Sequence, residues 1–263
     1  MTHAAPGCAP ATPWTRVLDR AGAPPRRRLV VFPHAGGGAT AYLALFTDLP
    51  EDVEIVAVTL PGRDERMDEA PTCDLDRVVD AVAADLRRRE QGRPLPTVLF
   101  GHSLGAQLAV LAARSARPAH MSLVLSAQMA PSRFALRDTL TPRDVLYGGD
   151  VPQEILDDPD LLHWVTDLLT ADLELSRRAS RALAAVRVEG DLLVLGGRTD
   201  PLVDRAGLLA WREHAGGRFH QESFAGGHFY LFEEPARRSV LDHVTRLLDR
   251  LAAPAAPTGG RPS

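Results

Sequence analysis

The sequence contains no lysine and no asparagine, and its only cysteines are Cys8 and Cys73. Two cysteines are too few for a disulfide framework, and they lack metal-ligand spacing, so we expect a cytoplasmic protein without a bound metal. Because the sequence has no lysine, the 30 residues counted as lysine or arginine are all arginines. Together with 34 acidic residues they give a formal net charge of −4. This balance leaves no basic stripe of the kind that binds nucleic acid.

Long apolar runs are also absent, and nothing in the sequence approaches the length of a membrane span. The first 13 residues are rich in alanine and proline and have neither a basic start nor an apolar segment, so no export signal is expected. With 263 residues, of which 45% are hydrophobic, the chain can bury one sizeable core. We therefore expect a single domain over residues 26–252, preceded by a flexible leader over 1–25 and followed by a disordered tail over 253–263.

A strand, a tight turn and a helix are predicted in succession near the middle of the chain. The short strand 97–100 leads into Gly101-His-Ser-Leu-Gly105, and an apolar helix pattern continues to Ala113. In a nucleophile elbow, a serine in a strained backbone conformation is exposed above the sheet, and glycines let the strand and the helix approach each other closely. Ser103 is the candidate nucleophile. The alternative is a tight turn in which the serine has no chemical role.

Strand and helix patterns alternate along most of the chain. Between about residues 131 and 185, however, several helices follow one another, and we interpret them as an insertion that forms a lid or binding region. The alternation elsewhere predicts a mostly parallel sheet with helices on both faces. Strands are expected over 29–32, 53–58, 97–100, 122–127, 191–195 and 219–224, and further helices over 41–48, 74–89 and 237–251.

A serine nucleophile needs an imidazole to take its proton and a carboxylate to orient that imidazole. Asp200 follows the predicted strand 191–195, and His228 lies in a glycine-containing loop after the last strand. The order Ser103, Asp200, His228 is that of the α/β-hydrolase fold. Asp204 is the alternative acid, His214 and His220 are alternative bases in positions where exposed histidines are usual, and His102 is expected to be a packing residue.

The loop Pro33-His-Ala-Gly-Gly-Gly38 follows the first predicted buried strand. It matches neither GxGxxG nor GxxxxGK[ST], so nucleotide binding is not favoured. The loop fits an oxyanion hole better, in which the backbone N–H groups of Ala35 and Leu104 stabilise the developing negative charge. His34 either shapes this loop or takes part directly in the chemistry.

The sequence contains a set of short motifs: Phe32-Pro-His-Ala-Gly-Gly37, Leu60-Pro-Gly-Arg63, Gly101-His-Ser-Leu-Gly105, Leu169-Thr-Ala-Asp172, Asp200 and Gly226-Gly-His-Phe229. Together these motifs make residues 29–250 resemble the type II thioesterases that accompany polyketide and nonribosomal peptide synthetases. The resemblance implies hydrolysis of acyl thioesters on the phosphopantetheine arm of acyl or peptidyl carrier proteins, which clears misprimed or stalled synthetases, and it implies no cofactor. One departure is Gln128-Met129, where many members have two arginines.

Docking of a carrier protein to a net negative chain requires a local basic patch. The loop that contains Arg63 and Arg66 follows the strand 53–58 and leaves the sheet at its carboxyl edge, where ligands enter such sheets, so these arginines are candidate carrier contacts. They could equally pair with Asp64, Glu65 or Asp68 on a solvated loop. Two other functions remain open: a carboxylesterase or lipase that acts on small oxyesters, and a catalytically silent hydrolase fold that serves as a binding module.

Overall fold

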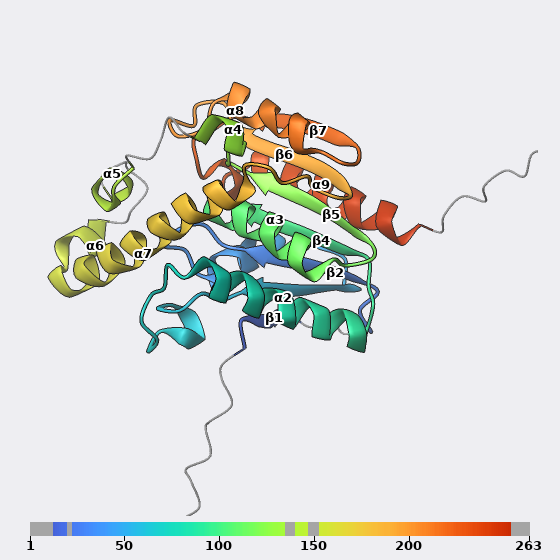
Figure 1. Cartoon of the computed structure of the whole chain (residues 1–263), viewed down its shortest axis with the longest axis horizontal. Coiled ribbons are helices and arrows are strands. Elements are labelled where there is room, and N and C mark those ends of the chain that lie inside the picture. The colour runs from blue at the N-terminus through green and yellow to red at the C-terminus, as the bar shows by residue number, and fades with distance from the viewer. Residues whose placement is uncertain (1–12, 20–22, 135–139, 147–152, 254–263) are drawn as a thin grey trace, which may run out of the picture.

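Seven strands form one mixed sheet in the computed structural model of the chain, which describes residues 13–19, 23–134, 140–146 and 153–253 (Figure 1). The strand order is β1-β3-β2-β4-β5-β6-β7. Only β1 pairs antiparallel, with β3, and the other neighbours are parallel. The strands are β1 Thr15–Asp19, β2 Arg27–Phe32, β3 Val53–Val58, β4 Thr97–His102, β5 Met121–Ser126, β6 Asp191–Gly197 and β7 Phe219–Phe224.

Both faces of the sheet are apolar because successive strand side chains point to opposite sides. In β2, Val30 and Phe32 belong to one buried cluster, whereas Leu29 and Val31 belong to the other. A sheet buried on both faces needs helices on both, and the predicted parallel architecture is confirmed.

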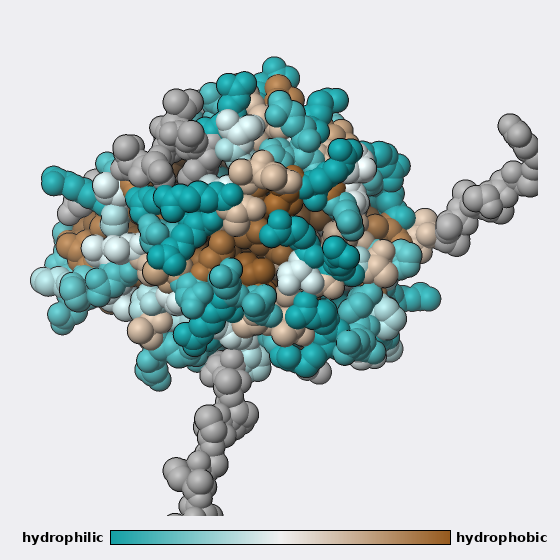
Figure 2. All heavy atoms as spheres, in the orientation of Figure 1, coloured by the Kyte–Doolittle hydropathy of each residue, from teal (hydrophilic) through white to brown (hydrophobic). Residues whose placement is uncertain are grey.

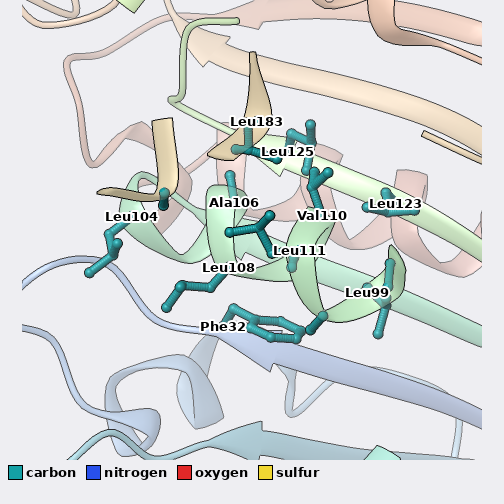
Figure 3. Close-up of a cluster of buried hydrophobic side chains, with 14 of the residues drawn as sticks. Phe32, Leu99, Leu104, Ala106, Leu108, Val110, Leu111, Leu123, Leu125 and Leu183 are labelled. Carbon is teal, nitrogen blue, oxygen red and sulfur yellow. The ribbon is translucent and has the colours of Figure 1, made fainter. Parts of the chain in front are cut away.

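One face is covered by α2 (Leu75–Gly92), α3 (Leu104–Ala116) and the second half of α7 (Pro159–Leu183). Figure 3 shows the cluster on this side, where α3 packs on side chains of β2, β4 and β5. The opposite face is covered by the 3-10 helix η1 (Ala39–Tyr42), α1 (Leu43–Phe46), the 3-10 helix η4 (Tyr230–Phe232) and α9 (Ala236–Ala252).

The helical insertion lies between β5 and β6. Its described helices are α4 (Pro131–Phe134), α5 (Pro142–Leu146), α6 (Gln153–Asp157) and α7. Figure 1 shows α5, α6 and the start of α7 beyond one end of the sheet, and α7 then runs back across α3. The remaining helices are η2 (Asp64–Arg66), α8 (Arg205–Leu209) and η3 (Ala210–His214).

Local predictions fail in two places. The flexible leader expected over 1–25 is wrong for Thr15–Asp19, because these residues form the edge strand β1 against β3. The helix expected over 41–48 is a 3-10 turn followed by a single α-helical turn. The rest of the leader to residue 12, and the tail from residue 254, lie outside the described residues.

On the face drawn in Figure 2, apolar residues gather near the middle and hydrophilic side chains surround them.

Candidate active site

Ser103 is the turn residue between β4 and α3, and its backbone has φ 53° and ψ −121°. A non-glycine residue with a positive φ is strained and persists only where its surroundings hold it. The N–H of Ser103 donates to the carbonyl of Ser126 at the end of β5, at 2.8 Å. A Cβ on Gly101 would overlap the carbonyl of Gly105, so the elbow closes only with glycine here. The structure therefore has the predicted elbow geometry.

The start of α3 lies directly against the end of β2. A Cβ on Gly105 would overlap the carbonyl oxygen of Phe32, so glycine allows the two backbones to touch. This contact brings the loop after β2 to the elbow, and Ala35 and Leu104 line one cavity together with Ser103. Leu104 is the first residue of α3, and the first N–H groups of a helix have no intrahelical acceptor. The two proposed oxyanion donors therefore lie beside the serine.

Asp200 and His228 form a hydrogen-bonded pair at the carboxyl edge of the sheet. His228 Nδ1 lies 2.9 Å from Asp200 Oδ2, and the two side chains are almost completely buried. The other carboxylate oxygen, Oδ1, accepts from the N–H groups of Leu202 (2.7 Å) and Val203 (3.1 Å). With its second oxygen occupied, the carboxylate faces the imidazole in one orientation and favours the tautomer protonated on Nδ1. His228 Nε2 is then the nitrogen that can accept a proton.

The alternative acid and bases have other partners. Asp204 caps α8 by accepting from the N–H of Gly207 at 2.7 Å. His214 was expected to be exposed but is buried, and its Nδ1 bonds the carbonyl of Val186 at 2.8 Å. His220 is exposed on β7, 3.6 Å from Glu222. Two cavities, described below, contain Ser103 in their walls, and Asp204, His214 and His220 line neither of them.

Two further histidines surround the pair. The ring of His102 lies 5.1 Å from that of His228, and the ring of His34 lies 5.8 Å from that of His102. The pKa of His34 is lowered from 6.5 to about 3. Burial is the main cause, and the nearby His228 and Arg63 lower the pKa further. Burial also lowers the pKa of His102 well below its ordinary value. Both rings are therefore neutral at physiological pH.

Each of these neutral rings has a hydroxyl partner. Nδ1 of His34 is 2.8 Å from the hydroxyl of Tyr42, and Nδ1 of His102 is 2.9 Å from the hydroxyl of Ser126. The Ser126 hydroxyl also bonds the hydroxyl of Tyr230, which lies just beyond His228, at 2.8 Å. His102 thus packs as predicted and also links the elbow to the loop that holds His228. His34 bonds the loop after β2 to η1 through Tyr42.

Two adjoining cavities share Ser103 and His228 in their walls. The larger has an empty volume of about 1160 Å³, including its opening, and Trp164, Val165 and Leu169 of α7 make its wall largely apolar. The smaller has an empty volume of about 570 Å³ and brings Gln128, Met129, Ser176 and Arg177 around the serine. Both share Ala35, Ser103, Leu140, Leu173, Leu202 and His228.

Arg63 and Arg66, the predicted carrier contacts, are buried, with 4% and 3% of their surface exposed. Arg63 forms two 2.8 Å hydrogen bonds to the carboxylate of Asp172 on α7. Arg66 bonds both carboxylate oxygens of Glu69 and stacks over the ring of Trp14. Asp64, Glu65 and Asp68, the acidic residues considered from the sequence, are therefore not the partners of these arginines. Neither guanidinium is available at the surface, so direct docking of a carrier by these side chains finds no support.

Gln128 and Met129 stand where many type II thioesterases have two arginines, and they line the same cavity as Ser103. The Gln128 carbonyl accepts from the indole N–H of Trp211 at 2.8 Å, which fixes this segment after β5. Gln128 and Met129 both line the smaller cavity, and Met129 also lies against Gly207 of α8.

Sequence reasoning assigned no role to Asp172, although a signal was present. Asp172 interrupts the apolar stripe formed on α7 by Leu168, Leu169 and Leu175, and a carboxylate in such a position must find a buried partner. Among the described residues, no group of three His, Cys, Asp or Glu side chains could hold a metal ion. No helix in that part of the chain is long and apolar enough to cross a bilayer.

Comparison with known proteins agrees with this geometry. The thioesterase domain family matches residues 27–248. The chain is 34% identical over 275 residues to AMB antimetabolite synthetase AmbE of Pseudomonas aeruginosa, an alignment that covers 97% of the chain but only 12% of AmbE. Among solved structures, the type II thioesterase BorB from the borrelidin biosynthetic cluster is 30% identical (TM-score 0.71, covering 89% of this chain and 97% of BorB).

The thioesterase RedJ from the prodiginine pathway of Streptomyces coelicolor is 29% identical (TM-score 0.74, covering 92% of this chain and 91% of RedJ). These likenesses confirm the predicted α/β-hydrolase fold and the predicted resemblance to type II thioesterases. The chain belongs to the thioesterase domain family.

Proposed function

We propose that the protein is a serine thioesterase that hydrolyses acyl thioesters carried on the phosphopantetheine arm of an acyl or peptidyl carrier protein. The main support is that the strained Ser103 shares a cavity with His228 of the Asp200–His228 pair and with Ala35 and Leu104, the residues whose N–H groups would bind the oxyanion. The proposed role is to clear misprimed or stalled polyketide and nonribosomal peptide synthetases. A cytoplasmic location, expected from the cysteine content, is part of the same proposal.

In the first half-reaction, Ser103 Oγ attacks the thioester carbonyl carbon while His228 Nε2 takes the hydroxyl proton. The carbonyl oxygen becomes an oxyanion, which accepts hydrogen bonds from the N–H groups of Ala35 and Leu104. When the tetrahedral intermediate collapses, the C–S bond breaks and the proton passes from His228 to the leaving sulfur. Asp200 holds the imidazole and stabilises its positive charge during this step.

The second half-reaction reverses these roles with water as the nucleophile. His228 takes a proton from water as the water attacks the acyl-serine ester, and it returns that proton to Ser103 Oγ when the ester C–O bond breaks. The products are a carboxylic acid and the regenerated serine. The neutral His34 and His102 take no proton in this cycle because their pKa values are too low.

The two cavities suit the two ends of the substrate. The larger one, lined by Trp164, Val165 and Leu169, suits an apolar acyl group. The smaller one is lined in part by the polar residues Gln128 and Ser176, whose side chains are of a kind that hydrogen-bonds the amides of a pantetheine arm. On this assignment, Gln128 takes the place of an arginine along the path of the arm.

The decisive experiment compares one acyl group on three leaving groups: a carrier protein, a short thiol and a matched alcohol. A thioesterase that serves carriers has the highest kcat/KM for the carrier thioester and the lowest for the oxyester. Equal or higher kcat/KM for the oxyester would indicate a carboxylesterase or lipase instead. Lack of turnover on all three, together with no labelling of Ser103 by a serine-directed phosphonate, would indicate a binding module.

A further inference from the structure

Two motifs that the proposed chemistry does not use meet in the interior. Arg63 ends the segment Leu60-Pro-Gly-Arg63, and Asp172 ends the segment Leu169-Thr-Ala-Asp172 on α7. Arg63 Nη1 and Nη2 each lie 2.8 Å from one oxygen of the Asp172 carboxylate. This parallel two-bond arrangement is the most directional that the two groups can form.

The pair is also bonded to the oxyanion loop. Oδ2 of Asp172 accepts the backbone N–H of Gly36 at 2.7 Å, and Nη1 of Arg63 donates to the carbonyl of Gly37 at 3.2 Å. Two successive residues of the loop are thereby attached to one ion pair. Gly36 has φ +76°, and a Cβ on it would contact Leu169 of α7, so the loop is also packed closely against the helix.

These bonds lie next to Ala35, which carries one of the proposed oxyanion donors. Because Gly36 N belongs to the peptide group that follows Ala35, fixing that N–H limits rotation about the Ala35 backbone and hence the direction of its own N–H. A donor helps only when it points at the position that the oxyanion will occupy, and reorienting it during reaction has a cost. The ion pair is well placed to hold that direction.

Burial of the pair needs an explanation beyond stability. Asp172 is 1% exposed and Arg63 is 4% exposed. A buried ion pair is often no more stabilising than two apolar side chains of similar volume, because both charges lose their hydration. Stability alone therefore does not explain why charges occupy these positions, whereas the bonds to Gly36 and Gly37 do.

We propose that Asp172 and Arg63 are positioning residues that set the oxyanion loop and connect it to the inserted helix α7. The inference rests on the proposed function, because it assumes that Ala35 donates to an oxyanion formed at Ser103. It assigns the two motifs one shared role, and it makes correct seating of α7 a condition for fast acyl transfer.

The test is the double variant Arg63→Met/Asp172→Leu, which removes both charges and leaves no unpaired buried ion. We expect the melting temperature to stay close to that of the wild type. For a small acyl thioester, kcat should fall about 10- to 100-fold with KM changed less than about threefold, because a misdirected donor loses part of the factor of about 10² to 10³ that one oxyanion donor supplies.

A transition-state analogue separates positioning from general damage. A trifluoromethyl ketone adds to Ser103 and places an oxyanion in the hole, so its affinity should fall by the same factor as kcat/KM. The matched control is Arg28→Met/Glu54→Leu. These residues form another largely buried pair, with Arg28 Nε 2.6 Å from Glu54 Oε2. The pair lies near the amino-terminal ends of β2 and β3, whereas Ser103 and Arg63 follow the carboxyl ends of their strands. This control should change neither kcat nor affinity for the ketone.

Three outcomes would overturn the inference: a kcat within threefold of the wild type, an equal fall in the control, or a rise in KM without a fall in kcat. If the double variant does not fold, Asp172→Asn replaces it, because it keeps the shape but presents an amide to Arg63. A fall of at least fivefold in kcat is then expected, and an unchanged kcat contradicts the inference. If Ser103→Ala keeps wild-type turnover, the proposed function itself is wrong.

Discussion

His34 provides a test of the buried polar network that is independent of catalysis. Its Nδ1 lies 2.8 Å from the hydroxyl of Tyr42, and that hydroxyl is 3.3 Å from the backbone N–H of His34. If the hydroxyl accepts from the backbone and donates to Nδ1, the ring must be neutral. His34→Asn places an amide oxygen close to the position of Nδ1, so it keeps an acceptor for Tyr42 and removes the titrating group.

The magnitude follows from the pKa of His34, which burial lowers from 6.5 to about 3. Below pH 6.5 the unfolded chain binds a proton at this residue, whereas the folded chain does not until the pH approaches 3. Acid therefore favours unfolding, at about 1.4 kcal/mol per pH unit. Between pH 7 and pH 5 the full effect is about 2 kcal/mol. His34 is partly exposed at the cavity wall, and solvent screening reduces the expected value to about 1–2 kcal/mol.

The assay is urea denaturation of the wild type and of His34→Asn at pH 7 and pH 5. The wild type should lose about 1–2 kcal/mol more unfolding free energy between these pH values than the variant does. The contribution of the buried His102 is common to both proteins and cancels. His120→Asn is the control, because His120 is exposed and its removal should leave the wild-type pH dependence in place. An identical pH dependence in the wild type and in His34→Asn would refute the claim that His34 stays neutral in the folded protein.

Three further predictions concern the site and its surroundings. In acid, log kcat/KM should fall with a slope of one, because His228 must be neutral to act while His34 and His102 stay neutral; a slope of two or more would mean that a second histidine titrates. Gly105→Ala should lower the unfolding free energy by about 3 kcal/mol or more, since its Cβ would overlap the carbonyl of Phe32; wild-type stability in denaturant would contradict this close contact. In hydrogen exchange, the exposed first half of α7 should exchange faster than its buried second half, and equal protection would argue against a movable start to this helix.

Sequence patterns predicted the sheet and the order of the catalytic candidates because both depend on local signals. Apolar runs mark the buried parallel strands, and Gly101 and Gly105 are needed wherever a strand turns so sharply into a helix. The edge strand β1 has a weaker signal: its pairing with β3 is long-range, and Trp14–Arg16 mixes apolar and polar types. Edge strands of this kind are stabilised mainly by their neighbours.

The sequence did not reveal that Arg63 forms a buried ion pair, because its partner lies far away along the chain. Asp172 is 109 residues from Arg63, and only the path of α7 across the sheet edge brings them together. The sequence placed Arg63 in a loop at the correct edge but could not distinguish a solvated guanidinium from a buried one. The same limit applies to His214, which the surrounding helical pattern suggested was exposed and which tertiary packing buries.

The proposed nucleophile is tested most directly by Ser103→Ala on an acyl-carrier thioester. The variant should fold as the wild type does, because the glycines and the bond to Ser126 set the turn while only the hydroxyl is removed. Steady-state hydrolysis should fall by about 10³-fold or more. If the folded variant keeps more than about a tenth of the wild-type rate, Ser103 is not the nucleophile and the account of this site is wrong.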